Sequence, residues 1–445
     1  MATTRRHFLA GAAGAGVAGE MLAQSQQPSP NDRIQIALIG NGIQGAGDAR
    51  TSLAAGGAEL VAVADVYDGR LTRAKELWGD KVFTSRDYRE VLARRDVDAV
   101  IVATPDHWHR RIAVDAMNAG KDVYCEKPMV QSIDDGKEVI DAQKRTGRIL
   151  QVGSQRVSSI VYQKARDLLE AGAIGELNLV EAWVDRNSAI GAWQYSIPPD
   201  ASTATIDWER FLGRAPKVPF DPIRLFRWRN YRDYGTGVGG DLFVHLFSGM
   251  HFMLDSLGPT RVFATGGIRY WKDGRDVPDV MLGLYDYPAR GRFPAFNLAL
   301  RVDFKDGGTE TQGFRFIGSE GILTLGNNVT VAKQPPESEP GQTADTFSKA
   351  MEAQYMKEYR ARYPQLRPNA DSMRGVHEET YQPPRGYSDW LEHHRNFLNA
   401  VRTRKAVIED AVFGFRAAGP ALLSNVSYFE NRACHWDPDA MTLKG

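Results

Sequence analysis

The chain has 445 residues and a formal net charge of +0, which is enough length for two domains and an insertion. The balanced charge gives no basis for a nucleic-acid-binding surface or a polybasic membrane patch. Cys125 and Cys434 are too few for a disulfide framework or a cysteine metal cluster, and the sequence leaves open whether they form one bond.

Residues 1–30 are predicted to lie outside the fold, as a signal and a linker. Thr4-Arg5-Arg6-His7-Phe8-Leu9 has the pattern of a twin-arginine export signal, and a weakly apolar Ala/Gly run follows it. That run is too short and too rich in glycine to span a membrane as a stable helix. We expect a periplasmic protein that is exported folded, with the export machinery as its only membrane partner. A chance arginine pair and an uncleaved anchor are the alternatives.

Residues 31–155 alternate between short apolar runs and helical patterns. Strands are predicted at 34–39, 60–64, 98–103, 122–125 and 149–153, and helices at 46–55, 71–78, 112–119 and 133–146. Such alternation predicts an α/β domain with a doubly wound parallel sheet, the Rossmann arrangement.

A glycine loop follows the first predicted strand. Gly40-x-Gly42-x-x-Gly45, with Ile43 and Gln44 inside it, opens a predicted helix, and Asp65 closes the next strand. In this context the pattern predicts a dinucleotide site, with the glycines close to the pyrophosphate and Asp65 on the adenosine ribose. Asp65 favours NAD because it repels a 2′-phosphate, while Arg70 and Arg73 nearby keep NADP open. A tight turn without a nucleotide is the structural alternative.

Thr104 and Pro105 end a strand at the sheet edge where ligands bind. Asp106-His107-Trp108-His109 follows and is predicted to be a loop beside the nicotinamide half of the cofactor. We expect the two histidines to make hydrogen bonds within this loop and to bind no metal, because no acidic or cysteine ligands accompany them.

Val123-Tyr124-Cys125-Glu126-Lys127-Pro128 ends another strand at the same edge. Lys127 is therefore predicted to point toward the nicotinamide and the substrate, where a lysine has a lowered pKa and can bind a hydroxyl or transfer a proton. An ordinary surface lysine before a turn is the alternative. The peptide bond before Pro128 can be cis, which the sequence alone does not determine.

Residues 156–445 are predicted to form an α+β domain with a large, mostly antiparallel open sheet. Strands are predicted at 177–186, 260–271, 279–287, 295–304, 312–317 and 322–325, and helices at 162–171, 387–403 and 411–429. An aromatic, Pro- and Arg-rich segment spans 191–234. Residues 335–386 are polar and are predicted to be an insertion with one helical stretch at 346–363.

The second domain also holds a carboxylate and a histidine four residues apart. Asp241 and His245 follow a glycine run as a helix begins, so they are predicted to share one helix face. A histidine suits proton transfer because its ordinary pKa lies near working pH. A helix-capping Asp and a buried structural His are the alternative. Gln155, Arg156 and Arg229 are predicted to contact the substrate.

Together these motifs resemble the Gfo/Idh/MocA family of NAD(P)-dependent oxidoreductases, over nearly all of 31–435. The resemblance implies hydride transfer between the nicotinamide and a hydroxyl of a sugar, sugar derivative or cyclitol, with His245 as general base and Asp241 orienting it or binding the sugar. It also implies that Thr104, Pro105, His109 and Glu126 contact the cofactor, and that the open sheet forms a homodimer or homotetramer.

Three hypotheses remain for the function. Export favours a tightly retained cofactor, as in the glucose–fructose oxidoreductase branch, because an exported enzyme cannot readily exchange NADH with a pool. Some exported relatives are instead redox-neutral glycoside hydrolases that oxidise a ring hydroxyl, eliminate the aglycone and reduce the product again. A non-catalytic sugar-binding protein is the third hypothesis, and the presence of Lys127 and the glycine loop argues against it.

Overall fold

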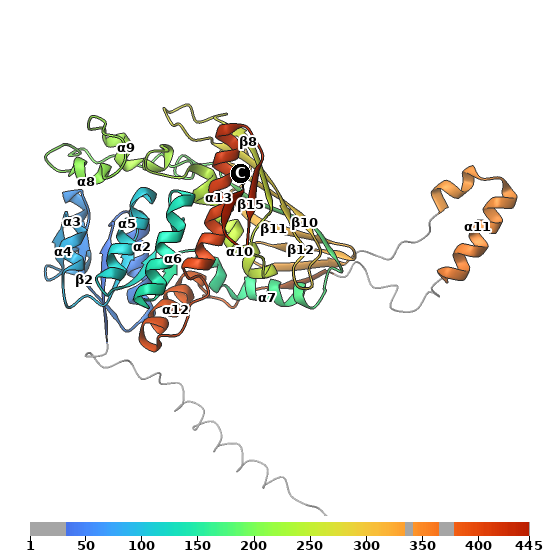
Figure 1. The fold of residues 1–445 in the computed structure, drawn as a ribbon, viewed down its shortest axis with the longest axis horizontal. Coiled ribbons are helices and arrows are strands. Elements are labelled where there is room, and N and C mark those ends of the chain that lie inside the picture. The colour runs from blue at the N-terminus through green and yellow to red at the C-terminus, as the bar shows by residue number, and fades with distance from the viewer. Residues whose placement is uncertain (1–32, 334–340, 365–377, 445) are drawn as a thin grey trace, which may run out of the picture.

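The structure is a computed structural model, which describes residues 33–333, 341–364 and 378–444. Two sheets form its framework, and Figure 1 shows α13 (Ala411–Glu430) running between them. The predicted export signal and parts of the predicted insertion lie outside the described residues.

The first sheet has six parallel strands in the order β3-β2-β1-β4-β5-β6. Its strands are β1 (Ile34–Ile39), β2 (Ala58–Ala64), β3 (Phe83–Ser85), β4 (Ala99–Val102), β5 (Asp122–Cys125) and β6 (Leu150–Val152). The helices between them are α2 (Ile43–Ala55), α3 (Asp68–Trp78), α4 (Tyr88–Leu92), α5 (Asp106–Asn118) and α6 (Gly136–Thr146). β4 and β5 are buried along their whole length, as strands covered on both faces are. This strand order confirms the predicted Rossmann domain.

One local prediction in this domain was wrong. Asp106 to His109 form the first turn of α5 rather than a loop, with Pro105 as the N-cap residue. The carboxylate of Asp106 stabilises the N-terminus of α5. The residues that follow it have weak helix propensities, so the sequence pattern did not indicate this first turn. The short elements β3 and α4 were not predicted either.

The second sheet has ten strands in the order β14-β13-β12-β11-β7-β10-β9-β8-β15-β16. Its strands are β7 (Leu177–Asp185), β8 (Arg261–Gly267), β9 (Val280–Tyr287), β10 (Phe296–Asp303), β11 (Thr311–Gly318), β12 (Gly321–Leu325), β13 (Val329–Lys333), β14 (Glu378–Tyr381), β15 (Cys434–Asp437) and β16 (Thr442–Lys444). Only β7 and β10 pair in parallel, so the predicted mostly antiparallel sheet is confirmed.

One face of this sheet carries the helices of the second domain. Residues of β10 alternate between buried and exposed, which is typical of a strand with one covered face. The covering helices are α7 (Ile160–Glu170), α10 (Val244–Leu254) and α13. The opposite face is open, and Phe263, Leu282 and Leu284 are exposed on it.

The C-terminal part of the chain returns to the first domain. Helix α12 (Asp389–Thr403) packs against α2, where the Ser52 hydroxyl lies 2.8 Å from Nδ1 of His394. Just after α12, Arg404 forms an ion pair with Asp122 of β5. The body of the first domain therefore includes residues far beyond the predicted boundary at 155.

A covering segment, residues 187–234, lies over the edge of the parallel sheet where its strands end. Figure 1 shows its helices α8 (Trp208–Leu212) and α9 (Pro222–Phe226) above α3 and α4. Backbone hydrogen bonds hold the segment to the loop after β2, from Asp207 N to Val66 O at 2.9 Å and from Asp68 N to Thr205 O at 3.0 Å. Most aromatic side chains of the segment belong to the core, since Trp193, Trp208, Tyr231 and Tyr234 are buried.

The predicted insertion lies between β13 and β14. Its described part contains the 3-10 turn Gly341–Thr346 and α11 (Lys349–Arg362), and Figure 1 shows α11 standing away from the body. Elsewhere, Cys125 and Cys434 are both buried and free. Within the described ranges no helix is long and apolar enough to cross a membrane, and no group of acidic, His and Cys side chains is suited to a metal ion.

Candidate active site

The glycine loop joins β1 to α2 in a conformation that only small residues allow. Gly40 has φ +96°, and a Cβ there would lie 2.5 Å from the carbonyl oxygen of Ala103. A Cβ on Gly45 would lie 2.0 Å from the carbonyl oxygen of Gly40. Gly42 is the N-cap of α2, and no side chain caps that helix. The first amides of α2 are therefore open to an anionic ligand, as a dinucleotide pyrophosphate requires.

Asp65 is held at the end of β2, beside this loop. Its Oδ2 accepts a hydrogen bond from the Asn41 amide at 2.8 Å, and its Oδ1 accepts one from the Tyr67 amide at 3.0 Å. Arg70 pairs with the same carboxylate at 3.4 Å. The position of Asp65 suits the ribose hydroxyls of NAD, and Arg70 lies where it was predicted to keep NADP open.

A cavity of about 470 Å³ separates the glycine loop from the covering segment. The predicted cofactor residues that line it are Gly40, Gly42, Ile43, Gln44, Asp65, Thr104 and Pro105. From the opposite side the covering segment contributes Gln194, Tyr195, Trp228 and Arg229 among others. The open helix N-terminus at one end and Asp65 beside it fit a bound dinucleotide.

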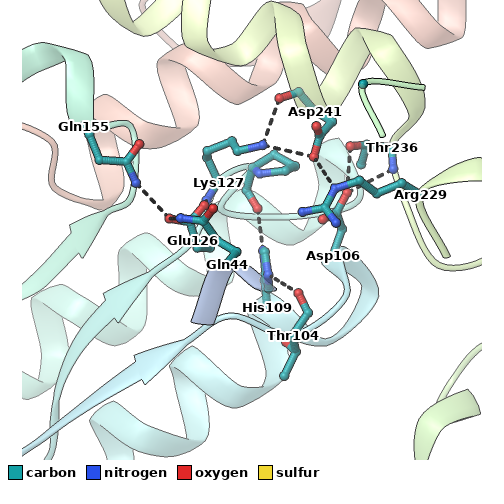
Figure 2. Close-up of polar contacts among 12 residues, drawn as sticks. Gln44, Thr104, Asp106, His109, Glu126, Lys127, Gln155, Arg229, Thr236 and Asp241 are labelled. Carbon is teal, nitrogen blue, oxygen red and sulfur yellow. Dashed lines mark hydrogen bonds and ion pairs between the residues drawn. The ribbon is translucent and has the colours of Figure 1, made fainter. Parts of the chain in front are cut away.

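Lys127 joins the two domains next to this cavity. Its side chain is nearly buried, and its Nζ donates hydrogen bonds to the backbone oxygen and to Oδ1 of Asp241, each at 3.0 Å. Arg229 donates from Nε to the same Oδ1 at 3.2 Å, and Figure 2 shows the two cations approaching Asp241 together. The peptide bond between Lys127 and Pro128 is cis.

The charges around Asp241 fix its ionisation. Although burial alone would raise its pKa, Lys127 and Arg229 outweigh burial and hold the pKa of Asp241 well below its usual value. The carboxylate is therefore ionised throughout the neutral range. It can keep Lys127 in one position while leaving part of the lysine ammonium for another ligand.

Asp241 and His245 lie on different helical turns. Asp241 belongs to a π-helical turn, Gly239–Phe243, and His245 belongs to the first turn of α10. Within the described part of the chain Asp241 bonds Lys127 and Arg229 rather than His245, so the geometry does not show the implied role of orienting the histidine. Such π-turns occur frequently at functional sites. Burial and the charge of Lys127 lower the pKa of His245 well below its usual value, which leaves a neutral imidazole.

Asp106 forms a second link between the domains. Its Oδ2 accepts hydrogen bonds from the amide and the hydroxyl of Thr236, at 3.0 and 2.8 Å, and its Oδ1 is buried without a partner. Burial and the nearby Asp241 raise the pKa of Asp106 to about 7. Burial in this position therefore favours the protonated form of the carboxyl group.

A buried polar network lies behind Lys127. Oε1 of Glu126 accepts from Gln44 Nε2 at 3.3 Å and from Gln155 Nε2 at 3.0 Å, and Gln44 also donates to Asp48 at 2.9 Å. Burial raises the pKa of both Glu126 and Asp48 well above the usual range. Glu126 and Gln155 therefore lie behind Lys127 and are not among the residues that line the cavity, and their contacts with cofactor and substrate stay predictions.

Two other predicted residues also lie away from the cavity. The ring nitrogens of His109 lie 2.7 Å from the carbonyl oxygen of Pro128 and 2.8 Å from that of Thr104, so His109 ties together the two turns at the sheet edge. Burial lowers the pKa of His109 to about 4, so the neutral ring donates to only one of these carbonyl oxygens, and both ring nitrogens face protein groups. Arg156 pairs with Asp389 at 2.8 Å instead of reaching the cavity.

Other candidate site residues were not singled out in the sequence. Gln194 and Tyr195 line the cavity, and Arg186 acts electrostatically on Asp241 and His245. No local motif surrounds any of the three. The path of the covering segment brings Gln194 and Tyr195 to the site, and Arg186 directly follows β7.

Comparison with known proteins supports the assignment of the first domain as a nucleotide-binding domain. Residues 34–154 match the Gfo/Idh/MocA family profile described as "Oxidoreductase family, NAD-binding Rossmann fold". The match covers the first domain and agrees with an NAD-binding Rossmann fold there, similar to that of the family.

Two curated relatives show how far the sequence likeness extends. Inositol 2-dehydrogenase 1 of Saccharopolyspora erythraea is 35% identical over 158 residues, which are 35% of this chain and 46% of the relative. Inositol 2-dehydrogenase of Rhodococcus erythropolis is 33% identical over 192 residues, which are 41% of this chain and 54% of the relative. The matches thus span about half the length of these relatives.

Solved structures extend the likeness to the whole fold. Levoglucosan dehydrogenase in complex with NADH and levoglucosan has a TM-score of 0.64 at 17% identity, covering 90% of this chain and 98% of that one. An NAD-binding oxidoreductase from Klebsiella pneumoniae has a TM-score of 0.64 at 18% identity, covering 91% and 99%. At these identities the likeness establishes the two-domain fold alone.

Proposed function

We propose that the protein is an NAD-dependent oxidoreductase that transfers a hydride between the nicotinamide and a hydroxyl-bearing carbon of a sugar, sugar derivative or cyclitol. The observation that carries the proposal is the buried Lys127–Asp241 pair near a neutral His245, beside a cavity that begins at the glycine loop. The relatives named above are dehydrogenases of an inositol and of levoglucosan, which supports this substrate class.

The side chains suit alcohol oxidation. A lysine ammonium has three N–H donors, and Lys127 gives two of them to Asp241, which leaves one for a substrate hydroxyl oxygen. The neutral imidazole of His245 takes the hydroxyl proton as the oxygen becomes a carbonyl oxygen. A bound nicotinamide supplies the hydride acceptor.

We also propose that the protein is exported and retains its nucleotide through many turnovers. The covering segment supports retention, because it roofs the cavity and is hydrogen-bonded to the loop after β2. The twin-arginine pattern, which lies outside the described residues, supports export. Denaturing the purified protein and assaying the released nucleotide tests retention, and a protein purified without nucleotide would contradict it.

A homodimer or homotetramer through the open sheet face is a further part of the proposal. Phe263, Leu282 and Leu284 are 39%, 44% and 58% exposed on that face, and such an apolar patch is suited to a partner subunit. Light scattering of the purified protein gives the number of subunits. A monomer at micromolar concentration would contradict this part alone.

The enzymatic test uses the full chain with a panel of hexoses, hexuronates, myo-inositol, levoglucosan and aryl glycosides. NADH formation or reoxidation of bound NADH by a carbonyl product is the expected result. Aglycone release from an aryl glycoside without net NADH would instead favour the redox-neutral hydrolase, which the comparisons do not support. The absence of both reactions, with no NAD binding, would contradict the proposal.

A further inference from the structure

Three arginines of the second domain gather where the cavity reaches Gln194 and Tyr195. Arg229 lines the cavity together with these two residues. Arg227 donates from Nε to the Tyr195 carbonyl oxygen at 3.0 Å and from Nη1 to Gln194 Oε1 at 2.6 Å. Arg186 donates from Nη1 to a backbone carbonyl of the covering segment at 2.7 Å. All three side chains are therefore held in place on one side of the site.

These arginines have little negative charge to balance them. Within the described ranges neither Arg186 nor Arg227 forms an ion pair with a carboxylate. Arg229 bonds Asp241 through Nε alone, and its Nη1 and Nη2 make no hydrogen bond to any described residue. Asp241 is already shared with Lys127. The ionised carboxylate of Asp241 thus faces three cations, Lys127, Arg229 and Arg186.

The other acidic groups nearby do not remove this excess. Asp106 is only partly ionised at neutral pH, because burial and Asp241 raise its pKa to about 7. Glu310 acts on Arg186, but it also accepts hydrogen bonds from the amide of Asn187 at 3.2 Å and from the hydroxyl of Ser188 at 2.5 Å. Uncompensated positive charge in a buried site is costly, and an oxidised nicotinamide beside it would add one more.

The phosphates of the cofactor do not serve as the missing anion. Their place is at the uncapped N-terminus of α2, where Arg70 lies 3.7 Å from the Cβ position of Gly42. Arg229 lies at the opposite, Lys127–Asp241 end of the site. The cavity therefore has two separate cationic regions, and the proposed function accounts for only one of them.

We propose that the carbohydrate substrate carries an anionic group, a carboxylate or a phosphate, which binds Nη1 and Nη2 of Arg229 with Arg186 providing a second positive charge. This inference rests on the proposed oxidoreductase function and narrows its substrate class. The forked nitrogens of a guanidinium match the paired oxygens of a carboxylate or phosphate. Lys127 remains available for the hydroxyl to be oxidised.

The test measures equilibrium binding by calorimetry to the full chain loaded with NADH, which cannot oxidise an alcohol. The ligands are methyl glycosides of the gluco, galacto and manno series, each as the neutral hexoside, the uronate and the 6-phosphate. We expect an anionic member of at least one series to bind about tenfold or more tightly than its neutral partner, as a charge-assisted bond predicts. Preference for the uronate assigns a carboxylate, and preference for the 6-phosphate assigns a phosphate.

Variants connect the preference to the arginine. Arg229→Gln is expected to reduce the anionic-to-neutral ratio to less than about threefold while NADH still binds, and Arg229→Lys to keep part of it. Arg224→Gln is the matched control, because Arg224 belongs to α9 in the same segment and pairs with Asp233 at 3.3 Å, outside the cavity lining. It should leave the ratio unchanged.

Three results would overturn the inference: equal or tighter binding of the neutral glycosides, no binding of any anionic glycoside, or an unchanged ratio in Arg229→Gln. Turnover of neutral sugars or cyclitols with such a result would leave the proposed oxidoreductase function intact. A different result would contradict the oxidoreductase function itself: the absence of NAD binding and of hydride transfer with every sugar.

Discussion

Replacing Lys127 by methionine tests the centre of the proposed mechanism, because it removes the ammonium and keeps most of the side-chain volume. Two bonds of 3.0 Å to Asp241 are lost, and the Arg229 bond at 3.2 Å remains. A hydrogen bond to a charged group contributes about 1.5–3 kcal/mol, whereas a buried carboxylate left alone costs about 3–5 kcal/mol. Since Arg229 still pairs with Asp241, we expect the free energy of unfolding to fall by about 2 kcal/mol.

The catalytic effect should be much larger than the effect on stability. Loss of a positioned hydrogen-bond donor to the oxygen that develops negative charge in the transition state lowers kcat by about 10²–10³-fold. NAD binding should change little, because the glycine loop and Asp65 are untouched. The assays are kcat from NADH formation with the best substrate of the panel, urea unfolding followed by tryptophan fluorescence, and calorimetric titration with NAD.

Lys121→Met provides the matched control for this experiment. Lys121 is also buried and donates to the carbonyl oxygens of Arg94 and Val97 at 2.7 and 2.8 Å, just before β5 and at the opposite edge of the sheet. We expect it to destabilise the protein without changing kcat per folded molecule. A Lys127→Met protein with kcat within about threefold of the parent would refute the mechanism, since loss of a donor to the reacting oxygen has a much larger effect than that factor.

Three further predictions concern the base, the glycine loop and acid stability. His245→Gln should lower kcat by about 10²-fold or more at neutral pH. In the parent protein, kcat/KM should stay constant to well below pH ~6.5, because the lowered pKa of His245 keeps it unprotonated there. A decline of kcat/KM already centred near pH ~6.5 would contradict the assignment of His245 as the base. Gly42→Ala should leave the Tm unchanged, because no atom lies closer than 3.7 Å to the added Cβ. The Cβ would instead occupy the space of the pyrophosphate, so NAD should bind about tenfold more weakly. Equal affinity by calorimetry would place the pyrophosphate elsewhere. Burial lowers the pKa of several histidines to about 3 or 4, so at these positions the unfolded chain binds more protons than the folded one below pH ~6.5, while the raised pKa values of buried Asp48 and Glu126 act in the opposite direction. The carboxyl groups are common to the parent and a His251→Gln variant, so the difference in urea midpoint in favour of the parent should shrink as the pH drops from ~6.5 toward ~4; a constant difference would show that the His251 ring is protonated in the folded state. The histidines concerned are His107, His109, His251, His393 and His394.

Local motifs carried most of what the sequence could predict. The glycine loop, Asp65 and Lys127 each follow a short buried strand, so their common sheet edge could be inferred before any tertiary contact was known. Arg229, which was predicted to contact the substrate, lies in the cavity wall. In each case a local pattern determines where the side chain lies.

Other parts of the site depend on contacts between distant residues. Asp106 and Thr236 are 130 positions apart, and nothing in either segment indicates the other. Glu126 and Gln155 follow strands at the expected edge, but both are buried and bond each other, and Gln44 also donates to Glu126. The π-turn at Gly239–Phe243 likewise changed the expected relation between Asp241 and His245, because the i, i+4 rule assumes a regular α-helix.

The bond between Lys127 and Asp241 has a consequence for the evolution and engineering of this protein. The lysine comes from the nucleotide-binding domain and the aspartate from the second domain, so neither domain contains a complete site. A chimera that takes its second domain from another protein would have to restore the hydrogen-bond distance between these two side chains to within a few tenths of an ångström. Exchange of the second domain should therefore change the substrate preference of an active enzyme only if the residues of the domain interface are adapted as well.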